Sequence, residues 1–116
     1  MTSIANSSID GDWIALGQAD EIAEDQGKAF TLPKESGELS IAVFHHQGEW
    51  YALEDCCSHA RIPIVDGPVK DGCVMCPWHY AEFDLKTGAA LSGPATEGLK
   101  TYPVRLTESG AIEVRL

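Results

Sequence analysis

Two short clusters of cysteine and histidine constrain the fold of this chain more than any other feature. Cys57 and His59 form a C-x-H cluster, and after sixteen intervening residues Cys76 and His79 form a C-x-x-H cluster. In an extended segment, residues two apart project to the same side, and Pro77 fixes the backbone directly after Cys76. Each cluster therefore presents one thiolate and one imidazole, and the fold must bring two loops face to face if all four bind one group.

Facing loops of this kind favour an iron–sulfur cluster. They can place both thiolates on one iron and both imidazoles on the other, as in a [2Fe–2S] cluster in which histidines replace two cysteines. Such a cluster carries one electron at a time. Structural zinc is the main alternative, but zinc sites usually pair like ligands at C-x₂₋₄-C and H-x₃₋₅-H spacings. Another zinc set would join Cys73 and Cys76 to Cys56 or Cys57 and one histidine.

Short apolar segments separated by turn residues indicate an all-β sandwich or barrel. Two hairpins are expected, one around residues 45–49 and one around residues 108–110. We therefore expect His45 and His46 to be solvated turn residues, and Pro103 to mark an edge strand or a bulge. Residues 19–27 suit either one helical turn or a solvated connection. The expected strands are residues 13–16, 29–32, 39–44, 50–53, 72–75, 81–85, 99–106 and 111–116.

Composition limits the classes of partner. The chain has 116 residues, 18 acidic against 8 basic residues and a formal net charge of −10. One domain is expected at this length. Nucleic acid is disfavoured as a partner because no basic stripe can neutralise phosphates. The acidity suits either plain solubility or docking on basic protein surfaces. Glu54 and Asp55, just before the first cluster, suit either docking charge or a solvated strand end.

The N-terminal segment lacks targeting signals. Residues 1–11 are polar and are expected to be a disordered leader without a signal peptide, followed by a single domain over residues 12–116. No apolar run is long enough for a membrane span. Four cysteines without an export signal favour a reducing compartment. The expected location is the cytoplasm.

The two clusters and the segments after them closely resemble the Rieske family. The resemblance rests on Cys57-Ser58-His59, on Cys76-Pro77-Trp78-His79 followed by residues 81–88, on Ser92-Gly93-Pro94-Ala95, and on residues 99–104. It implies an antiparallel β-sandwich with a small cluster-binding subdomain at about residues 54–95. It further implies that Cys57 and Cys76 ligate a buried iron, that His59 and His79 ligate an outer iron, and that residues 93–95 cover the cluster.

Three positions separate this chain from the respiratory members of the family. Those members carry a disulfide between the two cluster loops, at positions that are Ile62 and Trp78 here, and a serine where this chain has Tyr80. Fewer hydrogen bonds to the sulfurs lower the potential, so we expect a value of about −150 mV. The chain thus resembles soluble, oxygenase-associated ferredoxins, most of which have glycine at the Tyr80 position. Cys56 and Cys73 are extra thiols, expected to be small, partly buried apolar residues unless they form a local disulfide or have a redox role.

The resemblance implies an electron carrier and not an enzyme. The chain shows no catalytic constellation and no Gly-rich dinucleotide fingerprint, so it needs partners on both sides. The expectation is a monomeric one-electron carrier that shuttles electrons from a flavin-dependent NAD(P)H reductase to a terminal aromatic-ring hydroxylating oxygenase. The alternative is a Rieske-type small subunit of a larger reductase, such as nitrite reductase. A third, non-redox alternative is a zinc-stabilised interaction module, which would be a colourless protein.

Overall fold

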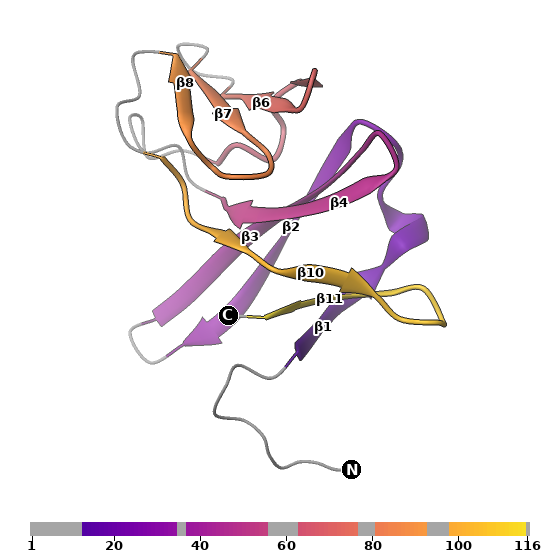
Figure 1. The fold of residues 1–116 in the computed structure, drawn as a ribbon. Helices are drawn as coiled ribbons and strands as arrows, with labels where there is room; N and C mark the ends of the chain where they lie inside the picture. Colours follow the sequence, from indigo (N-terminus) through magenta and orange to yellow (C-terminus); the bar gives the residue numbers. More distant parts are fainter. Residues whose placement is uncertain (1–12, 35–36, 56–62, 77–80, 93–97, 116) are drawn as a thin grey trace.

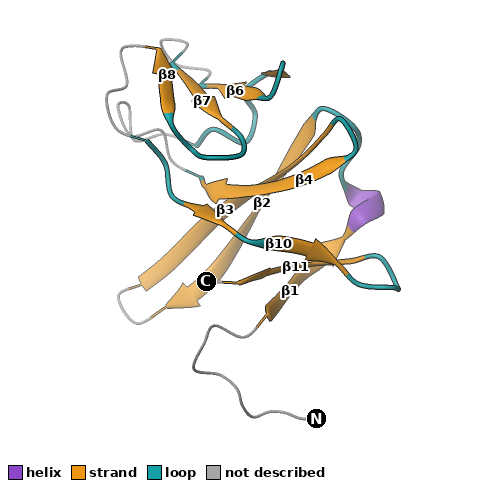
Figure 2. Cartoon of the chain, in the orientation of Figure 1, coloured by secondary structure: helices purple, strands orange, loops and turns teal. Residues whose placement is uncertain are grey.

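The computed structural model describes residues 13–34, 37–55, 63–76, 81–92 and 98–115, and in these ranges the chain forms three antiparallel sheets (Figures 1 and 2). Sheet A has the order β1 (Trp13–Gln18), β11 (Ala111–Arg115) and β10 (Val104–Leu106). Sheet B has the order β2 (Gln26–Lys34), β3 (Gly37–His46), β4 (Glu49–Glu54) and β9 (Thr101–Tyr102). Sheet C has the order β5 (Val69–Lys70), β6 (Cys73–Met75), β7 (Glu82–Asp84) and β8 (Ala90–Ser92).

Sheet B is the shared middle layer of the molecule, with sheet C above it and sheet A below it in Figure 1. Four consecutive residues of β3, Ile41–Phe44, are completely buried. Ile41 and Val43 belong to the hydrophobic core shared with sheet A, whereas Ala42 and Phe44 belong to the core shared with sheet C. Because successive side chains of a strand point to opposite faces, this apolar run serves both cores. The expected antiparallel all-β sandwich is confirmed.

The first expected hairpin has a tighter turn than its sequence indicated. Gln47 and Gly48 have φ values of 52° and 78°, which is the pattern of a two-residue type I′ turn. Strand β3 therefore continues through His45 and His46, and β4 begins at Glu49. Asp71 and Gly72, with φ values of 53° and 81°, make the same kind of turn between β5 and β6.

The prediction that His45 and His46 are solvated turn residues was wrong. The side chain of His46 is only 5% exposed, and its Nδ1 lies 2.6 Å from Oδ1 of Asp25. The backbone N–H of Gly72 donates to Nε2 of the same ring at 2.9 Å. Because Nε2 accepts, the ring proton is on Nδ1 and is donated to Asp25. His46 thus joins the β3–β4 hairpin of sheet B to the β5–β6 turn of sheet C. The His45 ring stacks on Trp50, with 4.2 Å between ring centroids.

Pro103 divides the strand that was expected over residues 99–106. The chain pairs with β4 as β9, passes Pro103, and then pairs with β11 as β10. Because proline donates no backbone hydrogen bond, it suits the point where the chain leaves sheet B for sheet A. The helical turn expected within residues 19–27 is a 3₁₀ helix, η2, at Ala19–Glu21. The predicted leader, residues 1–11, and its boundary lie outside the described residues.

Among the described elements, no helix has the length and apolar character that crossing a membrane requires.

Candidate metal centre

The residue directly after strand β6 is the predicted ligand Cys76, which is completely buried. Strands β6 and β7 pair antiparallel as far as Met75 and Glu82, and the backbone N–H of Cys76 then donates to the carbonyl of Ala81 at 2.7 Å. The segment 77–80 therefore starts and ends at neighbouring positions of one hairpin. His79, the other predicted ligand of this segment, lies outside the described residues.

Asp55 holds the two ends of the first predicted ligand loop. Its backbone N–H donates to the carbonyl of Ser40 on β3 at 2.9 Å. Its Oδ1 accepts hydrogen bonds from the backbone N–H groups of Ile64 at 2.8 Å and Val65 at 3.0 Å. The described residues on either side of the segment 56–62 therefore meet at Asp55. The predicted ligands Cys57 and His59 are in this segment, outside the described residues.

The two ligand segments are anchored at the same end of sheet C. Ile64 belongs to the same buried cluster as Cys76, and Gly67 passes so close to β6 that an added Cβ would lie 1.8 Å from the carbonyl oxygen of Met75. The backbone N–H of Met75 donates to the carbonyl of Pro68 at 3.0 Å. Only a residue without a side chain permits this approach.

The segment predicted to cover the cluster starts at the same edge. Glu82 is paired with Met75 on one side and with Ser92, the last residue of β8, on the other. The chain is described again from Gly98, and the N–H of Leu99 donates to the carbonyl of Gly88 at 2.7 Å. Three segments that the sequence assigned to one centre are thus anchored around Cys76 or on the strands beside it. The predicted cover itself, residues 93–95, lies outside the described residues.

The structure excludes the zinc set that uses both Cys73 and Cys76. Burial alternates along this strand, with Val74 and Cys76 buried and Cys73 and Met75 partly exposed, so the two cysteines face opposite sides. Side chains on opposite sides of extended chain cannot converge on one ion. The two Cα atoms are also about 10 Å apart, which excludes a disulfide between them, because a disulfide reaches about 7 Å. Cys73 is partly buried, as expected, and Cys56 lies outside the described residues.

The surroundings of Cys73 keep its thiol protonated. Partial burial raises its pKa, and the carboxylates of Asp84, Glu82 and Asp71 raise it further because they oppose a negative thiolate. Asp84 is directly opposite Cys73 in the β6–β7 register. A metal ligand needs the thiolate form, so these surroundings do not favour Cys73 as a ligand.

Cys76 has surroundings that fit a ligand of an iron–sulfur cluster. Its neighbours in the core include Phe83, Leu85 and Ile64, an apolar setting in which an unbound thiolate would be poorly solvated. Iron bonding removes that cost by neutralising the thiolate, and the apolar shell keeps water away. The donor chemistry of Cys76 and the placement of the residues that flank the three segments therefore fit a cluster that Cys76 would help to hold.

Another group of possible ligands in the described residues does not form a metal site. Glu24, Asp25 and His46 lie close enough together to share an ion. Both ring nitrogens of His46 are already used, one by Asp25 and one by the Gly72 N–H. The ring therefore has no lone pair left for a metal.

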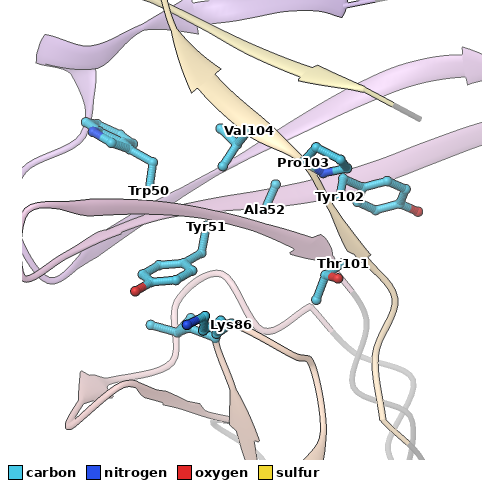
Figure 3. Close-up of a pocket in the computed structure, with 9 residues that line it drawn as sticks. Trp50, Tyr51, Ala52, Lys86, Thr101, Tyr102, Pro103 and Val104 are labelled. Carbon is cyan, nitrogen blue, oxygen red and sulfur yellow. The ribbon is translucent and has the colours of Figure 1, made fainter. Parts of the chain in front are cut away.

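A hollow of about 350 Å³ lies between β4, the β9–β10 segment and the β7–β8 turn (Figure 3). Tyr51 points from β4 toward Lys86 on that turn, and Trp50 and Tyr102 also line the hollow. The lining residues offer no thiol, imidazole or carboxylate. This hollow is therefore not the metal centre.

Comparisons with known proteins agree with the centre that the geometry indicates. Residues 12–103 match the Rieske [2Fe-2S] domain. The chain belongs to this family, and it carries one Rieske-type [2Fe–2S] cluster. Within the family, it is an electron-transfer protein and not a catalytic subunit.

The most informative relatives are ferredoxins. The chain is 39% identical over 105 residues to the anthranilate 1,2-dioxygenase ferredoxin subunit of Burkholderia cepacia, covering 90% of this chain and 93% of the relative. It superposes on the Sphingomonas yanoikuyae B1 ferredoxin with a TM-score of 0.81 and 27% identity, covering 90% and 99% of the two chains. A chain in the complex of reduced oxygenase and oxidized ferredoxin in carbazole 1,9a-dioxygenase gives a TM-score of 0.77 and 25% identity, with 89% and 92% covered.

The sequence did not reveal the role of Asp55. It was expected to be a docking charge or a solvated strand end, but it is 7% exposed and bound to three other residues. The available signal was an aspartate directly after a strand and before a ligand loop, a residue type that often accepts hydrogen bonds from nearby backbone N–H groups.

Proposed function

We propose that this protein is the ferredoxin component of a multicomponent oxygenase system, in which it accepts single electrons from a flavin-dependent NAD(P)H reductase and delivers them to a terminal aromatic-ring hydroxylating oxygenase. The observation that supports this most directly is that the residues flanking three predicted cluster segments meet near buried Cys76 in a chain of the Rieske family. The names of its relatives, which are dioxygenase ferredoxin subunits, support the same system.

In this proposal the two predicted cysteine ligands and the two predicted histidine ligands have different roles. Cys57 and Cys76 hold the inner iron, and His59 and His79 hold the outer iron. When bound, the cluster supplies a site that gains and loses one electron. The core around Cys76 excludes water from the sulfur side, and the imidazoles form the side that faces a partner. The absence of the inter-loop disulfide and of a serine at Tyr80 supports a potential near the bottom of the Rieske range, about −150 mV.

The partners are expected to dock briefly on an acidic surface. The net charge of −10 favours encounter with basic patches on the reductase and the oxygenase. We place the protein in the cytoplasm, because an unoxidised thiol such as that of Cys73 persists in a reducing compartment. We also expect the protein to act as a monomer.

Reconstitution of the electron chain tests this function. The protein should be reduced by a dioxygenase-type flavin reductase with NADH, and the reduced protein, separated from the reductase, should support product formation by a terminal oxygenase. Cys76→Ser, which should lose the cluster, is the negative control. Failure of the reduced protein to pass electrons to any such oxygenase, together with stable co-purification with a larger reductase, would assign it to the small-subunit class instead.

A further inference from the structure

Asp55 is a buried acidic residue, whereas the other acidic residues in the described ranges are at least partly exposed. Only His46 and Asp55 are buried polar or charged residues within the described ranges. A buried carboxylate is costly unless hydrogen bonds compensate for the lost water, so its location at the start of the first ligand loop requires an explanation.

Its hydrogen bonds join three parts of the fold. On the side of sheet B, its backbone N–H donates to the carbonyl of Ser40, and the Ser40 hydroxyl donates to its Oδ2 at 3.5 Å. On the other side, its Oδ1 accepts from two consecutive backbone N–H groups, those of Ile64 and Val65. One carboxylate oxygen therefore connects the end of β4 to a point nine and ten residues later.

The N–H of Ile64 depends on Asp55 because no solvent reaches it. Ile64 is completely buried, so its N–H would lose a hydrogen bond without gaining water if Asp55 were displaced. The carbonyl of Ile64 meanwhile accepts from the N–H of Gly67 at 2.9 Å, and Gly67 is in close contact with Met75, the residue before Cys76. The contact path thus runs from Asp55 to the second ligand loop.

We propose that Asp55 is the positioning residue of the first ligand loop, and that it acts through the place of its Oδ1 acceptor and not through its charge. Its hydrogen bonds join the residue before the segment 56–62 to Ile64 and Val65 after it, and we infer that this connection is what the ligands Cys57 and His59 need in order to bind the same cluster as Cys76. This inference rests on the proposed function for the identity of the ligands. The hydrogen bonds that carry it are independent of that function.

Two substitutions separate acceptor position from charge. Asp55→Asn removes the charge but keeps a carbonyl oxygen for both N–H groups, and its amide can donate to the Ser40 hydroxyl. Asp55→Glu keeps the charge but moves the acceptor by one methylene. We expect the half-life of the visible absorption in excess iron chelator to stay within about twofold of wild type in Asp55→Asn and to fall by about tenfold or more in Asp55→Glu.

Two further readouts distinguish positioning from general stability. Amide hydrogen exchange at Ile64 and Val65 should be slow in wild type and Asp55→Asn and fast in Asp55→Glu. The paramagnetic resonance g-values of the reduced cluster should change only in Asp55→Glu. Ile112→Val, a deletion of one methylene in the core shared with sheet A, is the control, and it should leave the exchange at Ile64 and the g-values unchanged.

Each remaining outcome overturns the inference. Equal losses in Asp55→Glu and Ile112→Val would assign Asp55 to general stability. Faster cluster loss in Asp55→Asn than in Asp55→Glu, or lost amide protection in Asp55→Asn alone, would assign the role to charge. If wild-type protein binds no iron and sulfide, the proposed function fails, while the amide exchange of the three proteins still tests the Asp55 contacts.

Discussion

Gly67 shows how a single hydrogen atom in place of a side chain can determine the geometry of the candidate centre. The Cβ of an alanine at this position would lie 1.8 Å from the Met75 carbonyl oxygen, an atom of a paired strand. Gly67→Ala should therefore push the return of the first ligand loop away from β6 and lower the free energy of unfolding by about 1–3 kcal/mol.

Urea unfolding followed by tryptophan fluorescence measures this loss. Gly17→Ala is the matched control, because the Cβ added there would meet only the side chains of Glu21 and Phe30, which can move. Equal stability losses in the two variants would contradict the importance of the Gly67 contact.

Tyr102 gives the molecule a pH-dependent stability on the alkaline side. Burial raises its pKa, and the nearby Glu54 carboxylate raises it further. The folded state thus holds the phenolic proton more tightly than the unfolded state, so the contribution is complete below the unfolded value of about 10 and is lost as pH rises through the folded value. Tyr102→Phe should lose less stability than wild type when the pH is raised above about 10.

Chemical denaturation at a series of alkaline pH values checks this prediction. Cys73, whose pKa is also raised, contributes in the same direction from about pH 8.5, so both proteins should be compared in a Cys73→Ser background. Parallel stability curves for the two proteins would rule out the titration of Tyr102 as a cause.

Residue roles of this kind depend on contacts between distant parts of the chain. The sequence alone could therefore reveal only those roles that a local motif indicates. The ligand set is a prediction that rests on chemistry contained in local spacing, C-x-H and C-x-x-H, and of its four residues the structure describes Cys76. The roles of Asp55 and His46 could not be predicted, since the partners of His46 lie 21 and 26 residues away. A sequence pattern in one segment does not show which distant residue folding will bring into contact with it.

At the scale of elements, the existence of a strand was easier to predict than the residues at which it begins and ends. Apolar segments and glycine-containing turns placed the four strands of sheet B and strands β6 and β7 of sheet C, but they did not indicate the short strands β5 and β8. Strand ends were misjudged where a polar side chain is buried by another element, as at His46, which belongs to β3 although its residue type suggested a turn. Pro103 likewise divides one apolar segment between two sheets, because the strand partners change there.

His46 should contribute to the docking of sheet C on sheet B. His46→Ala removes a buried ring and leaves the Gly72 N–H and the Asp25 carboxylate without their partner, so we expect a loss of about 2–3 kcal/mol in the free energy of unfolding. Glu49→Ala is the control, since Glu49 is directly opposite His46 in the register but exposed. Loss of amide protection at Gly72 in His46→Ala alone would support the contact, and retained protection would contradict it.

At the scale of the whole molecule, one sheet is shared by two cores. Sheet A and one face of sheet B enclose the first core, and the other face of sheet B and sheet C enclose the second. This arrangement places the candidate centre on sheet C, whereas the first and last described strands lie in sheet A, and Cys76, Ile64 and Asp55 are buried. The layered arrangement followed from the resemblance and not from strand patterns, because an apolar strand does not show which partner covers each face.

The charge of the whole molecule should govern how fast it meets its partners. A net charge of −10 attracts basic surfaces over a distance that salt shortens, and at about 300 mM salt the screening length falls well below 10 Å. Turnover of a reconstituted reductase–ferredoxin–oxygenase chain should fall when that salt is added. An unchanged rate, with each enzyme's own activity verified in the same buffer, would contradict electrostatic steering.

The central claim is that Cys57, His59, Cys76 and His79 together hold a single two-iron cluster. Paramagnetic resonance of the reduced protein, combined with iron and acid-labile sulfide analysis, tests it most directly. We expect reddish-brown protein with a rhombic signal, about two irons and two sulfides per chain, and the loss of its visible absorption in His79→Ala. Purified protein without inorganic sulfide, or a His79→Ala variant with unchanged visible absorption, would contradict the claim.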